Sequence, residues 1–295
     1  MPQIESILCP VDFSDFSVNA YEYALSLAWH YKAKLFLQHV LYPLSSSFAA
    51  YGGETDYFEK GCQRIRADAE EKLQQFAKRH APTKIRPQCF VQDGSVTDLI
   101  LSLAKTRAVN LIVMGTHGLR GIDRLMVGSV THRVLRRAPC PVLAVRKPAH
   151  HLISSVHDPE PVHLRKMLLC ADFSDHAHRA SEYAVSMAKE YGAELILLHV
   201  LEDVPRSADL EIATEKVAKQ LKESIAPETR EGCIVKVIVR IGKPYQQIIQ
   251  LALEAQTDLV IMGVRGRGAL DTAIFGSTTQ RVIQLGSCPV LAVHI

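Results

Sequence analysis

The 295-residue sequence has little of several features that mark particular classes of protein. Aromatic residues make up 6% of the chain and tryptophan occurs once, at Trp29, which argues against a β-sandwich rich in aromatic strands. The seven cysteines are widely spaced, form no C-x-x-C pair and are odd in number, so we expect buried thiols in a reducing compartment. The 34 Lys and Arg barely exceed the 31 Asp and Glu, which excludes a strongly basic nucleic-acid surface.

Long apolar runs are also missing. The longest strand-like runs, such as 141–145 and 289–293, are far shorter than the roughly 20 residues that cross a membrane as a helix. The amino terminus enters a strand-like run at Ile4 without the basic segment and apolar stretch of a secretory signal. We therefore expect a cytoplasmic protein that binds neither membrane nor nucleic acid.

The sequence instead contains an internal repeat of one unit in two copies. A shift of 160 residues places 12–41 on 172–201, with 17 of 30 positions identical. A shift of 148 places 113–145 on 261–293, with 15 of 33 positions identical. Each unit is long enough to form a core of its own, so the repeat indicates a duplicated domain rather than a solenoid.

The two shifts differ by 12 residues, which the second copy therefore lacks. We expect the extra residues of the first copy in 43–61, where proline, a serine run and paired glycines predict a long surface loop. The sequence predicts a first domain at 1–147, a linker at 148–163 and a second domain at 164–295.

Each unit alternates short apolar runs with segments of helical periodicity. In the first copy the predicted strands are 4–11, 35–41, 87–92, 111–114 and 142–145. The predicted helices are one capped by Ser14 or Asp15 and reaching Tyr31, then 58–76, 97–106 and 129–137. Wholly apolar strands separated by helices imply a parallel sheet covered on both faces, so the fold class is α/β.

Ligands of such sheets bind beyond the carboxyl ends of the strands. Asp12 and Asp172 directly follow the first strand of each copy, where an Asp can also serve only as a helix cap. Val40 and Val200 end the second strand, where backbone groups could pair with the edge of a base, although this position alone says little.

A glycine pattern follows the fourth strand of each copy and is the most specific feature. Its members are Gly115, Gly118, Gly128 and Ser129 in the first copy, and Gly263, Gly266, Gly276 and Ser277 in the second. Glycine lets backbone amides approach a phosphate, and the helix that begins at the serine adds N–H donors and a positive dipole. The alternative is a tight loop with no ligand, but recurrence of the spaced set in both copies favours a polyanion site. Neither the P-loop nor the G-x-G-x-x-G dinucleotide pattern matches.

These residues resemble the universal stress protein family, whose nucleotide-binding members carry Asp after strand one and Gly-x2-Gly-x9-Gly-[Ser/Thr] after strand four. The resemblance covers nearly the whole chain twice and implies two tandem doubly wound domains, each with a five-stranded parallel sheet of order 3-2-1-4-5. It also implies an adenine nucleotide, ATP and possibly Mg²⁺, in each cleft. The last strands, 142–145 and 290–293, are expected to pair across the halves as an intramolecular pseudo-dimer, and whole chains to form a homodimer.

The resemblance assigns a role to each candidate residue. Asp12 and Asp172 would contact the ribose or base, and Val40 and Val200 the adenine through their backbone. The phosphates would be held by Gly115, Gly118, Gly128, Ser129 and Val130, and by Gly263, Gly266, Gly276, Ser277 and Thr278. The second loop has Arg265 where the first has His117, which predicts tighter phosphate contact in the second site at neutral pH.

The leading functional hypothesis is a stress-response regulator that senses adenine nucleotide through a change of conformation or oligomeric state. A slow ATP hydrolase is the alternative, and the carboxylates nearest its phosphates would be Asp12, Asp172, Asp123 and Asp271, although no residue is assigned as catalytic. A scaffold that binds another small ligand is the third possibility. His39 and His199 are expected to satisfy local hydrogen bonds rather than to bind a ligand.

Overall fold

The structure is a computed structural model that describes residues 3–42, 55–80, 85–118, 127–146, 163–202, 210–225, 233–266 and 276–294. The first half consists of β1 (Ser6–Pro10), α1 (Asp15–Tyr31), β2 (Lys34–Leu41), α3 (Thr55–His80), β3 (Gln88–Asp93), α4 (Val96–Thr106), β4 (Leu111–Gly115), α5 (Ser129–Arg137) and β5 (Val142–Val145). The second half consists of β6 (Lys166–Cys170), α6 (Asp175–Tyr191), β7 (Glu194–Leu201), α7 (Leu210–Glu223), β8 (Ile234–Ile241), α9 (Pro244–Glu254), β9 (Leu259–Gly263), α10 (Ser277–Leu285) and β10 (Val290–Val293).

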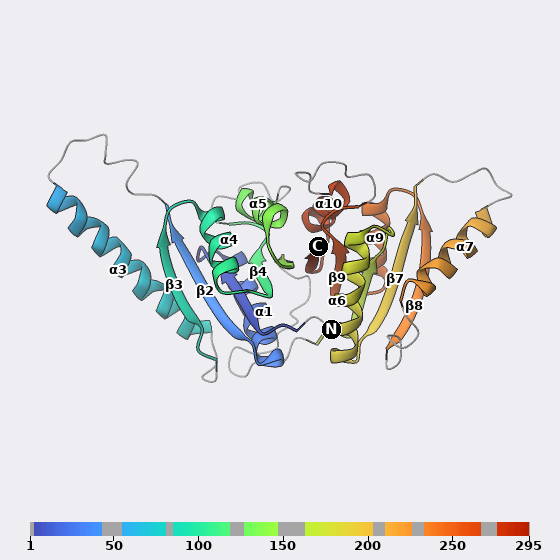
Figure 1. The fold of residues 1–295 in the computed structure, drawn as a ribbon, viewed down its shortest axis with the longest axis horizontal. Coiled ribbons are helices and arrows are strands. Elements are labelled where there is room, and N and C mark those ends of the chain that lie inside the picture. Colours follow the sequence, from blue (N-terminus) through green and yellow to red (C-terminus); the bar gives the residue numbers. More distant parts are fainter. Residues whose placement is uncertain are drawn as a thin grey trace.

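One sheet of ten strands runs through both halves in the order β3-β2-β1-β4-β5-β10-β9-β6-β7-β8 (Figure 1). Within each half the strands are parallel and follow the predicted order 3-2-1-4-5. At the centre β5 and β10 pair antiparallel, with Leu143 opposite Leu291. The α/β class, the sheet order and the pairing of the last strands across the halves are therefore confirmed.

The sheet separates two hydrophobic cores, because successive side chains of a strand point to opposite faces. In β2, Leu35 and Leu37 face the core that α1 and α3 cover, whereas Phe36 faces the core that α4 and α5 cover. Both cores continue across the β5–β10 pairing into the second half. The two halves therefore share their cores along this seam.

The difference in length between the halves lies largely in a helix. Helix α3 has 26 residues, whereas its counterpart α7 has 14. The expected loop over 43–61 is therefore wrong for residues 55–61, which form the first turns of α3; the rest of that range lies outside the described residues. Gly61 reads as a loop marker, but one helical glycine costs only about 1 kcal/mol, which a long helix packed on the sheet outweighs. The predicted linker, apart from residue 163, also lies outside the described residues.

Two cross-contacts connect the halves above the seam, where Figure 1 places α5 and α10 on either side. Arg146, which follows β5, donates from Nη1 to the carbonyls of Gln284 and Gly286 at the end of α10. His294, which follows β10, places Nε2 2.7 Å from the carbonyl of Leu135 in the last turn of α5. Each half thus holds the carboxyl end of the other half's helix, where donors and cations are favourable.

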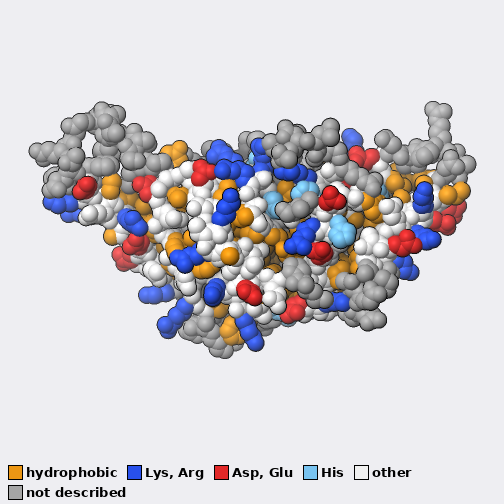
Figure 2. Space-filling view, viewed as in Figure 1, with side chains coloured by type: hydrophobic (Ala, Val, Ile, Leu, Met, Phe, Trp, Pro, Cys, Tyr) orange, Lys and Arg blue, Asp and Glu red, His pale blue; other side chains and the backbone are white. Residues whose placement is uncertain are grey.

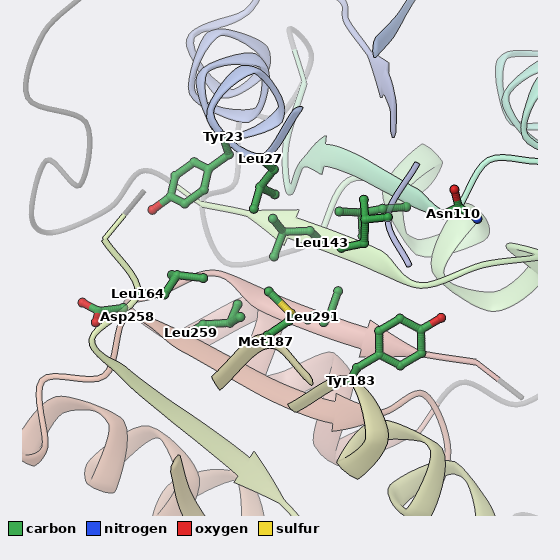
Figure 3. Close-up of a pocket in the computed structure, with 12 residues that line it drawn as sticks. Tyr23, Leu27, Asn110, Leu143, Leu164, Tyr183, Met187, Asp258, Leu259 and Leu291 are labelled. Carbon is green, nitrogen blue, oxygen red and sulfur yellow. The ribbon is translucent and has the colours of Figure 1, made fainter. Parts of the chain in front are cut away.

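On the opposite face, α1 and α6 meet near their ends, where the ring of His30 stacks on Tyr191 at 4.2 Å and Nε2 lies 3.3 Å from Glu190. A small cavity of about 20 Å³ lies beside the seam (Figure 3). Six matched pairs line it: Ile4 and Leu164, Tyr23 and Tyr183, Leu27 and Met187, Asn110 and Asp258, Leu111 and Leu259, Leu143 and Leu291. Of the described helices, none is long and apolar enough to span a bilayer.

Candidate functional site

The candidate site begins with a tight turn after β1. Ser14 caps α1, as predicted, and its hydroxyl accepts from the amide of Ser17. The preceding Phe13 has φ of 65°, a left-handed conformation that is uncommon for a bulky residue. Its ring packs against the His39 ring at 4.4 Å and carries the Lys72 ammonium 4.4 Å from its centroid. The strained backbone is thus fixed by packing on β2 and α3.

The turn fixes one oxygen of the Asp12 carboxylate. Oδ1 accepts hydrogen bonds from the amide of Ser14 at 3.1 Å, from its hydroxyl at 2.6 Å and from the hydroxyl of Ser17. Asp172 repeats the two bonds to Ser174 at the same distances, and Phe173 has φ of 60°. The alternative of a simple helix cap does not describe Asp12, because Ser14 caps the helix.

The other carboxylate oxygen lies against the glycine loop after β4. A Cβ at Gly118 would come 2.4 Å from Oδ2 of Asp12, and one at Gly266 would come 2.5 Å from Oδ2 of Asp172. Real Cβ atoms do not approach so closely, so a side chain at residue 118 or 266 would have to displace the aspartate or the loop. The structure therefore brings the predicted aspartate and the predicted second glycine together in both halves.

The first glycine of each loop has a packing role. A Cβ at Gly115 would come 2.9 Å from the backbone oxygen of Phe16, and one at Gly263 would come 2.8 Å from the backbone of His176. These glycines let the first turn of α1 or α6 lie against the end of β4 or β9. Contact of Gly115 and Gly263 with phosphate remains a prediction.

The third glycine caps a helix whose first turn is open. Gly128 donates its own amide to Thr116 at 2.8 Å, and no side chain caps α5. The amides of Ser129 and Val130 have no partner within the helix, as in the first turn of any α-helix. Ser129 is exposed, and Thr131 fixes the turn by donating its hydroxyl to the carbonyl of Gly115 at 2.8 Å. The donors available to an anion are therefore those of Ser129 and Val130 rather than that of Gly128.

The second half repeats this helix start. Gly276 donates its amide to Val264 at 3.0 Å, and Thr279 donates its hydroxyl to Gly263 at 2.9 Å. Ser277 is exposed and Thr278 is half-buried at the beginning of α10. The second half therefore has the same set of donors at the start of its helix.

Val40 presents backbone groups at the sheet edge. The last paired positions of β1 and β2 are Pro10 and Gln38, and the carbonyl of Gln38 accepts from the amide of Val11. Along a strand, the backbone N–H and C=O groups of every second residue point to the same neighbouring strand. The groups of Val40 therefore point to the β1 side, as the carbonyl of Gln38 does, at a position beyond the end of β1. Val200 has the same place relative to Leu198, whose carbonyl accepts from Ala171.

The two loops differ at one predicted residue. His117 is buried, lies 2.9 Å from the hydroxyl of Thr116 through Nδ1, and packs on the ring of Phe16 at 4.9 Å. Arg265 is half-buried, and its charge helps burial to lower the pKa of His176. The two side chains therefore differ in placement as well as in charge; the relative affinity of the two sites remains a prediction. Asp123 and Asp271 lie outside the described residues.

The strand histidines are satisfied as expected. Nδ1 of His39 donates to the carbonyl of Val11 at 2.8 Å, and Nδ1 of His199 donates to that of Ala171 at 2.7 Å. Burial lowers the pKa of His39. Both rings therefore support the turn that carries the aspartate.

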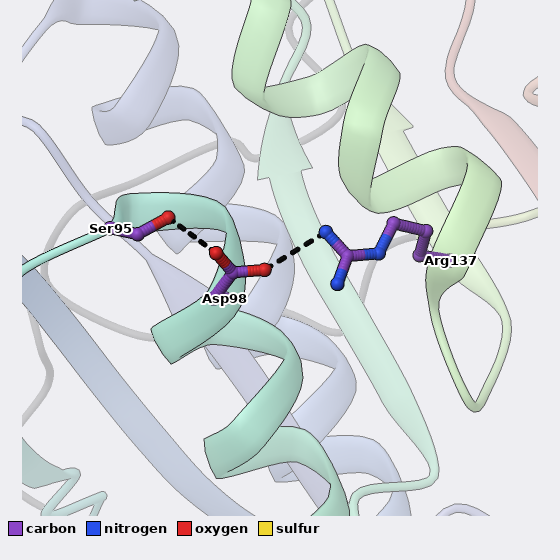
Figure 4. Close-up of polar contacts among 3 residues, drawn as sticks. All are labelled: Ser95, Asp98 and Arg137. Atoms are coloured by element: carbon purple, nitrogen blue, oxygen red, sulfur yellow. Dashed lines mark hydrogen bonds and ion pairs between the residues drawn. The ribbon is translucent and has the colours of Figure 1, made fainter.

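An ion pair fixes α5 relative to α4 (Figure 4). Asp98 accepts from the hydroxyl of Ser95 at 2.7 Å and from Nη1 of Arg137 at 2.9 Å. The hydrogen bond from Ser95, followed by that from Arg137, lowers the pKa of this exposed carboxyl. Figure 2 shows further basic side chains over α5 and α10, to which α5 contributes the exposed Arg133 and Arg136. Arg136 and Arg137 lie in the last turn of α5, at the end opposite to its open start.

Sequence reasoning missed three supporting residues: Phe13, Ser17 and Thr131. The repeat itself signals two of them, because Phe13 matches Phe173 and Thr131 matches Thr279. Ser17 has no such signal, since Ala177 stands at the matching position.

The fold and site define a tandem pair of doubly wound α/β domains with matched, open helix starts. The model of the universal stress protein family matches residues 3–146 and 163–294, and the chain therefore belongs to this family, as two tandem copies. A universal stress protein of Mycolicibacterium smegmatis is 28% identical over 296 residues, which is 98% of this chain and 96% of that protein. A Thermus aquaticus universal stress protein is 32% identical over 135 residues, which is 44% of this chain and 98% of that protein.

A solved structure supports the fold along the whole chain. The crystal structure of a universal stress protein from Archaeoglobus fulgidus aligns with a TM-score of 0.64 at 24% identity. The alignment covers 98% of this chain and 95% of that one. It therefore confirms the tandem doubly wound architecture.

Proposed function

We propose that each half binds an adenine nucleotide, ATP, at the carboxyl edge of its sheet. The observation that carries the proposal is the contact between Asp12 and Gly118 beside the uncapped start of α5, repeated by Asp172 and Gly266 beside α10. A carboxylate suits the hydroxyls of a ribose, and open backbone amides suit phosphate. Both groups follow strands that end at the same edge of the sheet, in each half.

Each part of the nucleotide would contact different residues of the site. The backbone of Val40 or Val200 would take the base, and the aspartate the ribose. Gly118 or Gly266 leaves room for the phosphates beside the aspartate. The exposed Ser129 and Ser277 would add hydroxyl donors, Val130 and Thr278 their amides, and Arg265 a charge in the second site.

The consequence of binding would be regulatory rather than catalytic. Thr116 donates its amide to Val145 at 3.0 Å, and Val264 donates to Val293 at 2.9 Å, so each loop is bonded to the last strand of its half. These strands form the seam, and a nucleotide that favours one loop arrangement would therefore favour one arrangement of the halves. We propose that this change in the arrangement of the halves is how a cytoplasmic stress-response protein signals that nucleotide is bound. We also propose that whole chains form a homodimer, whose assembly the same change would affect.

Native mass spectrometry of the freshly purified full chain tests the proposal. Two bound ATP masses support it, whereas release of ADP over hours supports the slow hydrolase and protein without nucleotide supports the scaffold. Addition of EDTA shows whether Mg²⁺ accompanies the phosphates. The double variant Gly118→Val, Gly266→Val should lose both ATP masses, because each new side chain meets an aspartate whose other oxygen is already bonded. Survival of affinity in a folded double variant would contradict the phosphate assignment.

A further inference from the structure

A buried amide in the first half has an atom without a partner. Gln38 on β2 is 1% exposed, and its Nε2 donates to Oε1 of Gln92 on β3 at 2.6 Å. Its Oε1 is also buried and forms no hydrogen bond with the described residues. An unpaired buried acceptor costs about 1–3 kcal/mol, so this amide is unfavourable in a purely structural position.

Gln38 lies on the same strand as Val40, the residue proposed to contact the base. Gln38 and Val40 share a face of β2, because they are two residues apart, and their Cα atoms are about 7 Å apart along the strand. That face is the one covered by α4 and α5, since Phe36 and Phe90 face the core there. Met114, at the end of β4, faces the same core.

A second buried polar atom lies on the same side. Thr97, in the first turn of α4, is 3% exposed, and its hydroxyl forms no hydrogen bond with the described residues. Helix α4 packs on β2, and its buried residues Ile100 and Leu101 belong to the core that Phe36 faces. The first half therefore has polar atoms with unused hydrogen-bonding capacity below this edge of the sheet.

At the matching positions of the second half, the residues are apolar or already have partners. Leu198 replaces Gln38 and is 1% exposed within the apolar core. Arg240 replaces Gln92 and pairs with Glu254. Tyr245 replaces Thr97 and lies under the guanidinium of Arg281, 4.7 Å from its ring centroid. The duplicated units thus keep the glycines of the loops after β4 and β9 but differ at these positions of β2, β3 and α4.

We propose that Gln38, held by Gln92, is a specificity-determining residue of the first site: its side-chain oxygen accepts a hydrogen bond from the exocyclic amino group of a 6-aminopurine. This inference rests on the proposed function and deepens it. A base with an amino group satisfies the acceptor, whereas a 6-oxopurine presents a second acceptor to it and leaves both unpaired. The second site, with Leu198 in this place, lacks this contribution.

The test compares ATP with inosine triphosphate, which carries oxygen in place of the amino group. Calorimetric titration of the full-length Gly266→Val variant measures the first site, and that of Gly118→Val the second. We expect the preference for ATP to be about ten-fold larger in the first site, equivalent to about 1.4 kcal/mol. Gln38→Leu, which copies Leu198, should reduce it to the value of the second site. Competition by inorganic tripolyphosphate, which has no base, should not change.

Two further variants exclude a merely structural effect. Gln88→Leu removes an exposed amide at the start of β3 and should leave the preference unchanged. Leu198→Gln together with Arg240→Gln should raise the preference of the second site. If ATP binds and its preference over inosine triphosphate is insensitive to Gln38→Leu, the inference is wrong while the proposed function stands. If neither nucleotide binds the wild-type chain, both are wrong.

Discussion

The carboxylate of Asp12 and the backbone of Gly118 are in contact, so closely that a Cβ at residue 118 would lie 2.4 Å from Oδ2. The first residue follows β1 and the second follows β4, the two neighbouring strands at the middle of the first half. Asp172 and Gly266 repeat the contact at 2.5 Å. Oδ1 of each aspartate accepts a hydrogen bond from the serine two residues later, so turning the carboxylate away from a new side chain would break that bond.

Gly118→Ala should therefore weaken ATP binding at the first site by at least about ten-fold, equivalent to about 1.4 kcal/mol. The added methyl group displaces either the aspartate or the loop. Calorimetric titration in the Gly266→Val background measures this site alone. Gly61→Ala is the matched control: a Cβ there meets nothing within 4 Å, and the helix should gain up to about 1 kcal/mol in stability with no change in affinity. Equal ATP affinity of Gly118→Ala and wild type would contradict the site geometry.

Thr279→Val should lower the free energy of unfolding by about 1–2 kcal/mol, because the buried hydroxyl bonded to Gly263 is lost. It should also weaken nucleotide binding at the second site, since this bond fixes the first turn of α10. Urea unfolding and titration with ATP measure the two effects. Thr106→Val, which removes an exposed hydroxyl bonded to Ser102 within α4, should change neither by a comparable amount. A stable Thr279→Val protein with unchanged affinity would show that the hydroxyl positions nothing.

Leu143→Ala should lower the free energy of unfolding by about 2–5 kcal/mol, the usual cost of truncating a buried leucine. Leu143 lies opposite Leu291 in the β5–β10 pairing, so the loss weakens the only strand pairing in the described residues that joins the halves. We expect the denaturant transition to broaden or to separate into two. Leu253→Ala, at an exposed position of α9, is the control and should cost less than about 1 kcal/mol. A single transition at the wild-type midpoint would contradict this role of the seam.

Acid should lower the free energy of unfolding, because the buried ring of His294 disfavours the protonated form. Burial lowers the pKa of His294 to about 4, whereas a histidine of the unfolded chain titrates near 6.5. The stability that the neutral His294 ring contributes is fully present above pH 6.5. It is lost as pH falls toward 4, because the unfolded chain takes up a proton that the folded chain does not. The loss reaches about 3 kcal/mol at pH 4.

The variant His294→Gln should flatten the dependence of unfolding free energy on pH between 6.5 and 4. The other histidines with lowered pKa remain in both proteins, so the difference between the two profiles reports residue 294 together with its coupling to His176. Urea unfolding at half-unit steps of pH measures it. Parallel profiles would show that His294 does not titrate differently on folding.

Tyr23→Phe should raise the free energy of unfolding by up to about 1 kcal/mol. Tyr23 lines the seam cavity, and its hydroxyl is buried and has no hydrogen-bond partner among the described residues. Removing it takes away an unpaired polar atom without changing the ring. Tyr183→Phe, at the matching but half-buried position, should be nearly neutral. A loss of stability in Tyr23→Phe would indicate a bond that the hydroxyl makes through water.

Much of the fold followed from patterns local in the sequence. The wholly apolar run 111–114 and the capped, periodic helix after Ser14 are both present as predicted. The length of α3 did not follow, because glycines near residue 61 resemble loop markers when the packing of the helix is unknown.

The site was predictable in its residues but not in its contacts. The repeat singled out Gly118 and Asp12, yet only the fold shows that the glycine is needed because the carboxylate occupies the space of its Cβ. The left-handed Phe13 and the bond from Thr131 to Gly115 depend on chain directions that periodicity does not contain. Gln38 could not be predicted as a site residue, because the repeat does not keep it. A polar residue in an apolar strand is notable only once its burial is known.

The most direct test is the stoichiometry of ATP binding to the full chain by calorimetric titration. We expect two sites in the wild type, one in each of Gly118→Val and Gly266→Val, and none in the double variant, with every variant folded by circular dichroism. A wild-type chain that binds no ATP, or a double variant that still binds two molecules, would contradict the account.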